Sequence, residues 1–315
     1  MTTGSTRKTI TRRKLLLGAT AGALATGAIV AGRSRKVQCY LLSGSASTLQ
    51  SPAIAGRGNI FSNPPFAMCH ASTLAFSGQN LVACWFGGSH EGRPDVAIWS
   101  AIYTPKCWQP PKRITGAKDE SGEPAACWNP VLWQQPGGPL HLFYKAGKTP
   151  RTWWAMHMAS NDNGHRWSTP ERLPQGFLGP VRNKPLLLPD NRLLCPSSTE
   201  DNGWQVHFEW TKDGGLTWEK SASLGGRAGM QIIQPALLVH PGGKLQALCR
   251  SRSGFIAQSW SHDGGRSWSP PEMTDLVNPN SAIDALTLAD GRHLLVHNPS
   301  PRCRTPLVVS LSNDG

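Results

Sequence analysis

The sequence predicts an all-β protein built from repeats, and three observations lead to this prediction. The 33 glycines and 26 prolines recur along the 315 residues, as expected for many short strands joined by turns. The apolar runs are short, and an eight-residue motif returns at a nearly constant interval. A hydrophobic content of 39% with scattered charge indicates a globular chain and not a disordered one.

The repeated motif is Ser/Thr-x-Asp-x-Gly-x-x-Trp. Full copies begin at Ser160, Thr211 and Ser261, and the first half of a fourth copy begins at Ser312. Successive copies are therefore 50 or 51 residues apart. Each interval contains several apolar runs, which is typical of a four-stranded propeller blade. We therefore expect a β-propeller.

The residue types of the motif suit a hairpin turn. A carboxylate beside glycine can accept bonds from the N–H groups of the turn, while glycine adopts a positive φ. The hydroxyl adds a local bond, and the tryptophan packs between sheets. Asp162, Asp213 and Asp263 are therefore predicted to be scaffold residues and not catalytic carboxylates.

The motif resembles the Asp-box, or BNR repeat, of sialidases and related propellers, and the resemblance extends over the chain after about Phe66. The chain is most similar to the predicted-neuraminidase branch of that superfamily. This resemblance implies a six-bladed β-propeller of sialidase type over residues 37–315. With a degenerate first box at Tyr103–Trp108, about five blades are present. We expect a propeller that is incomplete at its C-terminus, either as a fragment or with residues 37–63 supplying part of a closing blade.

The N-terminal segment, residues 1–36, has the pattern of an export signal. Arg12 and Arg13 precede an apolar run from Leu15 to Gly32, which resembles a twin-arginine signal. The alternative is a single membrane anchor, because this run just reaches the length that can span a bilayer. Both interpretations predict an exported protein, periplasmic or secreted, whose only membrane contact is this segment if it stays uncleaved.

The formal charge of +13 indicates an anionic partner. The basic residues form no continuous stripe beyond the N-terminus, so we expect an acidic glycan or oligosaccharide and no nucleic acid. The eight cysteines include no CxxC pair and no metal-ligand spacing, and we predict no metal and no cofactor. Most of them, such as Cys84 and Cys249, are expected in the core. The sequence does not decide whether one or two disulfides also form.

Candidate ligand-binding residues interrupt apolar segments at the same phase of successive repeats. In a propeller this phase corresponds to the central axis, where one polar cluster per blade would form a pocket. The candidates for substrate binding on this basis are Arg182, Lys184, Gln234, Asn280 and Asp284.

The sialidase resemblance adds expected roles. Sialidases hold the substrate carboxylate with three arginines, and Arg250 and Arg304 resemble the second and third of these. Glu91 lies where the family carries its acid/base carboxylate, with Asp95 as the second choice. His70 lies near the place of the first family arginine and is a further candidate for catalysis.

Two departures from the family bear on the reaction. Gln234 stands where sialidases have the glutamate that assists their tyrosine nucleophile, and an amide cannot accept the phenolic proton. None of Tyr40, Tyr103 and Tyr144 matches that nucleophile. Three functions therefore remain open. The leading one is a sialidase-like exo-glycosidase that hydrolyses a terminal acidic sugar. The others are a polysaccharide lyase or uronosyl/rhamnosyl hydrolase on the same propeller, and a non-catalytic carbohydrate-binding propeller.

Overall fold

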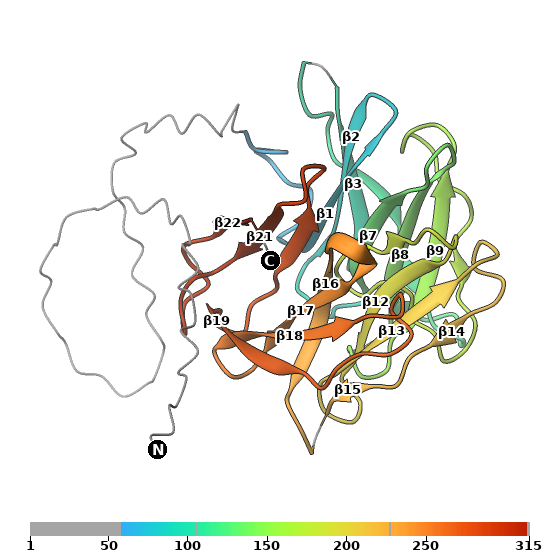
Figure 1. Cartoon of the computed structure of the whole chain (residues 1–315). Helices are drawn as coiled ribbons and strands as arrows, with labels where there is room; N and C mark the ends of the chain where they lie inside the picture. Colours follow the sequence, from blue (N-terminus) through green and yellow to red (C-terminus); the bar gives the residue numbers. More distant parts are fainter. Residues whose placement is uncertain (1–57, 105, 227, 314–315) are drawn as a thin grey trace, which may run out of the picture.

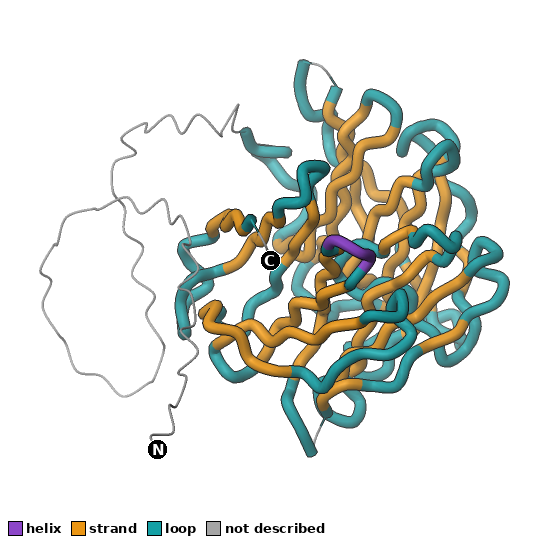
Figure 2. Tube along the Cα trace, in the orientation of Figure 1, coloured by secondary structure: helices purple, strands orange, loops and turns teal. Residues whose placement is uncertain are grey.

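The chain is an all-β propeller. The computed structural model describes residues 58–104, 106–226 and 228–313, and Figure 1 shows their strands arranged as successive sheets around a centre. Figure 2 shows strands and loops almost throughout. Within the described part, the single helical element is a 3-10 turn, η1 (Pro241–Gly243). The same residues contain no helix with the length and hydrophobicity of a membrane span.

The strands form five blades. Blade 1 contains β1 (Met68–Ser77), β2 (Asn80–Gly88), β3 (Ala97–Tyr103) and β4 (Lys112–Thr115). Blade 2 contains β7 (Cys127–Gln134), β8 (Leu140–Ala146), β9 (Trp154–Ser160) and β10 (Glu171–Arg172). Blade 3 contains β11 (Leu186–Leu187), β12 (Leu193–Thr199), β13 (Gln205–Thr211), β14 (Glu219–Lys220) and β15 (Leu224–Gly225). Blade 4 contains β16 (Ile232–Val239), β17 (Leu245–Ser251), β18 (Phe255–Ser261) and β19 (Glu272–Val277). Blade 5 contains β20 (Asp284–Thr287), β21 (His293–His297) and β22 (Val308–Ser312), and a small ladder of β5 (Ala117–Lys118) and β6 (Pro124–Ala125) follows blade 1.

The prediction of an all-β propeller is confirmed, whereas the number of six blades is wrong for the described residues. Blades 1 to 4 each have at least four strands, and blade 5 has three. The count of six came from the family resemblance and not from the repeats. Each blade uses about 50 residues, so the repeats in this sequence account for five sheets.

The Asp-box motifs are hairpin turns between the third and fourth strands, as predicted. In blade 3 the Asp213 carboxylate accepts bonds from the hydroxyl of Thr211 at 2.9 Å and from the backbone N–H of Thr217 at 2.9 Å. Thr211 Oγ1 in turn accepts the N–H of Gly215, and the Trp218 indole donates to the Gly215 carbonyl. The boxes of blades 2 and 4 repeat the Ser–Asp and Ser–Gly bonds. The carboxylates are therefore occupied in holding turns.

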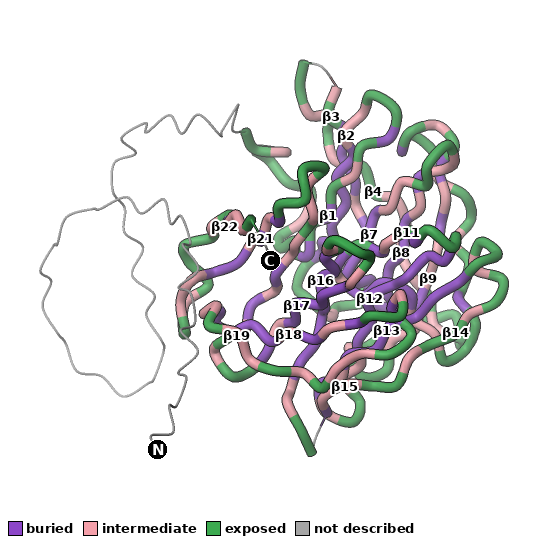
Figure 3. Tube along the Cα trace, in the orientation of Figure 1, coloured by how far each residue is buried: buried purple, intermediate pink, exposed green. Residues whose placement is uncertain are grey.

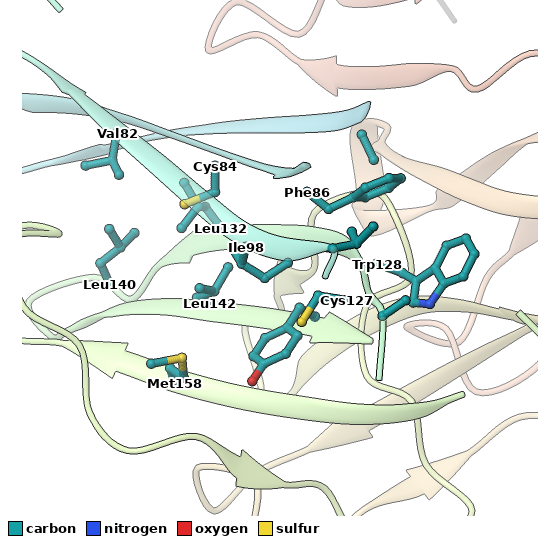
Figure 4. Close-up of a cluster of buried hydrophobic side chains, with 14 of the residues drawn as sticks. Val82, Cys84, Phe86, Ile98, Cys127, Trp128, Leu132, Leu140, Leu142 and Met158 are labelled. Carbon is teal, nitrogen blue, oxygen red and sulfur yellow. The ribbon is translucent and has the colours of Figure 1, made fainter. Parts of the chain in front are cut away.

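The core lies between neighbouring blades. Figure 3 shows that burial is concentrated on the inner and middle strands, including β7, β8, β12, β16 and β17. Between blades 1 and 2, one cluster joins side chains of both sheets, among them Val82, Ile98, Leu132, Leu142 and Met158 (Figure 4). Each sheet thus depends on its neighbour to remove its apolar face from water.

Four of the seven described cysteines, Cys84, Cys127, Cys195 and Cys249, are fully buried, as predicted for most of them, whereas Cys69 and Cys107 are exposed; these six are free. Burial raises the pKa of the Cys249 thiol to about 12, so it stays protonated and inert. The predicted export segment, residues 1–36, and the segment 37–57 lie outside the described residues.

Substitution Asp213→Ala tests the scaffold role. The hydroxyl of Thr217 donates to this carboxylate, lowers the pKa of Asp213, and would lose its partner in the variant. We expect the melting temperature to fall by about 3–6 °C in a thermal scan, as for loss of several turn hydrogen bonds. Asp275→Ala, at an exposed position of β19, is the matched control and should leave it unchanged. Equal melting temperatures for the two variants would contradict the scaffold role.

Candidate active site at the propeller axis

The starts of the inner strands share an unusual backbone conformation. One residue per blade has a positive φ at this point: Ala71 (55°), Asn129 (40°), Arg182 (85°), Gln234 (54°) and Asn280 (49°). In three blades the strand pairing also shifts register here, between His70 and Thr73 in β1, Trp128 and Val131 in β7, and Ile233 and Ala236 in β16. Left-handed residues other than glycine are costly, and they cluster at functional sites.

Three arginines from different blades converge on these strand starts, and we refer to Arg182, Arg250 and Arg304 as the arginine cluster. Arg250 Nε donates to Asn280 Oδ1 at 2.8 Å, and its Nη1 donates to Gln234 Oε1 at 3.2 Å. Arg304 Nη2 donates to the Asn280 carbonyl at 3.1 Å. Gln234 and Asn280 therefore orient the cluster.

Arg182 completes the arginine cluster from blade 3. Its Nη1 donates to the Ser72 carbonyl of β1 at 3.1 Å, so its guanidinium reaches across to blade 1. The sequence predicted only a general binding role for Arg182 and showed no counterpart of the first sialidase arginine. The structure brings Arg182 to the strand that carries His70, near the place where that arginine was sought.

The arginine cluster is a concentration of positive charge. Among the described residues its members donate to carbonyl and amide oxygens, and none forms a salt bridge. Burial and the neighbouring charge of Arg304 lower the pKa of Arg250 to about 10, so the guanidinium remains charged at neutral pH. Arg182 and Arg250 are half-buried and Arg304 is exposed, and the charges of Asp284 and Glu200 act on Arg182 and Arg250 without forming a salt bridge to them. Positive charge that is only partly compensated in this way attracts anions.

His70 and Glu91 lie beside the arginine cluster. Both line a cavity of about 30 Å³ together with Phe86 and Val96. Burial lowers the pKa of His70, Glu91 opposes this effect, and the charges of the cluster lower it further. His70 is therefore a neutral imidazole at pH 7 with a carboxylate nearby, which is the state required of a general base.

The Asp95 carboxylate is hydrogen-bonded within the loop that carries Glu91. It accepts bonds from the backbone N–H of Ser89 at 2.7 Å and from the Ser89 hydroxyl at 2.8 Å. The hydroxyl and then the N–H lower the pKa of Asp95, so it stays ionised. Both contacts close the loop that carries Glu91, and Asp95 is a positioning residue for that loop.

The two remaining predicted binding residues face each other across the centre. Lys184 of blade 3 lies 3.9 Å from the Asp284 carboxylate at the start of β20 in blade 5. This contact spans non-neighbouring blades, so both side chains lie at the axis. Neither described tyrosine belongs to this site: Tyr144 is fully buried in the core and Tyr103 lies at an outer turn of blade 1.

A buried charged network fixes the segment before Arg182. The Lys145 ammonium donates to the Pro180 carbonyl at 3.0 Å. Glu209 accepts the backbone N–H groups of Leu178 and Gly179 at 2.9 and 2.6 Å. Lys145 and Glu209 are fully buried, and the charge of Glu209 offsets part of the burial that lowers the pKa of Lys145 to about 7.

Sequence reasoning missed this network. The signal was present, since Lys145 in LHLFYKA and Glu209 in QVHFEW each interrupt an apolar strand with a charge. Within the described ranges, no group of three or more histidine, cysteine, aspartate and glutamate side chains is arranged to hold a metal ion.

The family assignment agrees with this architecture. A family profile described as "BNR repeat-like domain" matches residues 79–315. The chain belongs to this family. The match begins at the β1–β2 turn and includes all three full Asp-boxes of the BNR chain. A search of curated protein sequences finds no match.

Solved structures show the same fold at low sequence identity. A protein of unknown function from Dyadobacter fermentans is 18% identical, with a TM-score of 0.63 over 77% of this chain and 78% of that one. The Hadza microbial sialidase Hz136 is 16% identical, with a TM-score of 0.67 over 78% of this chain and 56% of that one. The NanB sialidase from Streptococcus pneumoniae is 15% identical, with a TM-score of 0.62 over 80% and 60%. The BNR chain thus spans less than two thirds of the two sialidases.

Substitution Glu209→Gln tests the buried network. The neutral amide keeps the shape of the side chain but leaves the buried His207 imidazole, 2.7 Å from Glu209, and the two N–H groups without an ionised acceptor. We expect the free energy of unfolding to fall by about 3–5 kcal/mol, the cost of removing one partner of a buried polar cluster. Urea unfolding measures this free energy, and Glu219→Gln, at an exposed position of the same blade, is the control. An equal, small effect of both substitutions would contradict the network.

Proposed function

We propose that the protein is a glycan-active enzyme that acts on a terminal acidic sugar. The observation that supports this proposal is the meeting of three guanidinium groups from three blades beside His70 and Glu91, none of which forms a salt bridge among the described residues. Residues 1–36, as a twin-arginine signal or anchor, would deliver this activity outside the cytoplasm.

The sugar carboxylate would bind the arginine cluster. A guanidinium offers paired N–H donors to a carboxylate, and these charge-assisted bonds are about twice as strong as neutral ones. Gln234 and Asn280 hold Arg250 in place before the ligand arrives, which reduces the ordering cost of binding. Lys184 and Asp284 would contact the hydroxyl groups of the sugar.

Proton transfer would fall to Glu91 and His70. In hydrolysis the protonated form of Glu91 donates its proton to the departing glycosidic oxygen, neutral His70 accepts one from the attacking water, and a proton passed from His70 to Glu91 restores both groups. This route needs no tyrosine nucleophile. It is consistent with Gln234, whose amide cannot assist such a tyrosine, and with the positions of Tyr103 and Tyr144 outside the site.

Elimination is the second candidate reaction, and the neutral state of His70 favours it. Positive charge around a sugar carboxylate acidifies the adjacent C–H. His70 would remove that proton, the glycosidic oxygen would leave, and a carbon–carbon double bond would form in the sugar ring. The same side chains thus serve hydrolysis of a terminal acidic sugar or cleavage of an acidic polysaccharide.

Lysine substitutions in the arginine cluster test ligand recognition. An ammonium keeps the charge but cannot form the paired bonds, so Arg250→Lys and Arg304→Lys should weaken binding of N-acetylneuraminic acid or glucuronic acid about tenfold to a hundredfold. Calorimetric titration measures the dissociation constants. Arg302→Lys, two residues from Arg304 and exposed, is the matched control. If all three variants bind as the wild type does, the cluster does not hold the carboxylate.

Substitution Glu91→Gln tests the reaction. We expect turnover to fall about a hundredfold or more with an unchanged melting temperature, because the exposed side chain contributes to proton transfer and not to packing. The assay uses a fluorogenic sialoside, a fluorogenic glucuronide and a polyuronate. An ultraviolet-absorbing unsaturated product identifies elimination. Turnover that survives the substitution would refute the role of Glu91, and no turnover of any of the three by the wild type would leave a binding propeller.

A further inference from the structure

The junctions between blades follow a common plan. The Asp-box turn of one blade packs on the first hairpin of the preceding blade. Between blades 1 and 2, Ser77 Oγ donates to Asn163 Oδ1 at 3.1 Å. A methyl group at Gly164 would lie only 3.0 Å from Val82. This junction is therefore closed.

The junction between blades 3 and 4 is closed in the same way. Arg192 Nη2 donates to the Gly264 carbonyl at 2.7 Å, and a methyl group at Gly265 would lie 2.6 Å from Leu194. The Asp-box tryptophan Trp268 stacks on Phe208 of the preceding blade, with ring centroids 3.8 Å apart.

The junction between blades 2 and 3 is only partly closed: Trp218 packs against a cluster that contains Phe143 and Leu193, but a groove stays open beside the Asp-box. The hydrogen bonds of the Asp213 and Trp218 side chains stay within their own box. Among the described residues, a methyl group at Gly215 would meet only Trp218 within 4 Å. A groove of about 660 Å³ lies here, bounded by the hairpin of blade 2 and the Asp-box of blade 3. We refer to it as the blade 2–3 groove.

One sequence position accounts for the difference. In the middle strand, the residue after the one that pairs with the first position of the Asp-box is Val82 in blade 1 and Leu194 in blade 3, and both receive the next Asp-box glycine. By strand register the equivalent residue of blade 2 is His141. Its imidazole instead bonds His157 at 2.8 Å and Gln135 at 3.0 Å. A polar ring with its own partners thus replaces an apolar contact.

The walls of the groove combine aromatic faces with neutral hydrogen-bonding groups. Trp133 lies 5.2 Å from the His141 ring, which stacks on His157 at 5.1 Å. Burial lowers the pKa of His141 and of His157 to about 4, so both are neutral at pH 7. The lining also contributes Gln135, Asn191, Phe143 and Trp218, and its charged side chains are Glu171, Arg172 and Lys212. Exposed Leu216 and Leu187 add apolar surface.

This lining suits a sugar ring better than an ion or a purely apolar ligand. Aromatic faces pack against the C–H face of a pyranose, while imidazole and amide groups bond its hydroxyls. The neutral histidines give no strong preference for an anion, in contrast to the arginine cluster. We infer that the blade 2–3 groove is a second carbohydrate-binding site, which takes a neutral pyranose of a glycan chain.

The blade 2–3 groove and the arginine cluster lie at opposite ends of the blades. The arginine cluster gathers at the starts of the inner strands, whereas the hairpin that borders the groove follows the end of β7. A glycan can therefore occupy the groove without competing for the axial site, and the inference does not depend on the proposed function.

Calorimetric titration of the full chain at pH 7 with lactose, cellobiose and N,N′-diacetylchitobiose tests the inference. We expect at least one disaccharide to bind. Trp133→Ala should weaken that binding about tenfold through lost ring contact. His141→Leu introduces the residue found at Leu194 and should close the groove with a similar loss while preserving the fold. Trp108→Ala, at another half-buried tryptophan, is the matched control.

The outcomes separate this site from the axial one. Binding lost in Trp133→Ala and His141→Leu, but retained in Trp108→Ala and Arg250→Lys, supports the second site. Absence of binding by all three disaccharides would overturn it, as would binding that persists in both groove variants or disappears only in Arg250→Lys. An anionic naphthalene dye that binds the groove and that no disaccharide displaces would also overturn it.

Discussion

The backbone at the start of each inner strand is the constraint on which the site depends. A left-handed residue there turns the chain as it enters the blade, and in blades 2 to 5 this residue is polar: Asn129, Arg182, Gln234 and Asn280. Gln234 and Asn280 adopt this conformation and hold Arg250, and Arg182 adopts it and crosses to blade 1. The strain of about 1–3 kcal/mol per such residue is offset by the inter-blade cores.

The electrostatics of the axis support the proposed binding of an anion. The guanidinium groups are held by neutral oxygens, and among the described residues the ion pair of Lys184 with Asp284 at the axis is long at 3.9 Å. The buried Lys145 and Glu209 keep the segment before Arg182 rigid without cancelling its charge. These arrangements leave positive charge at the axis that attracts a carboxylate. The Asp-boxes have no part in this chemistry, since their carboxylates are occupied by turn hydrogen bonds.

Local chemistry was predictable from the sequence, and contacts between blades were not. The Asp-box turns follow from residue types within eight positions, whereas the expected roles of Arg250, Arg304 and Glu91 came from the sialidase resemblance. The reach of Arg182 to Ser72 joins residues far apart in the chain, and no periodicity indicates it. The groove beside His141 forms because the Asp-box glycine of blade 3 does not pack against this side chain. The expected six blades came from the family and not from the repeats, and for that reason they were wrong here.

The central claim is that the axis recognises a carboxylate, and a change in the ligand tests it most directly. Titration of the wild-type chain with glucuronic acid and with glucuronamide compares two sugars that differ only in the carboxylate. The arginine cluster predicts that the acid binds at least about tenfold more tightly, with a preference that declines as salt is added. Equal affinities for the acid and the amide would contradict the account.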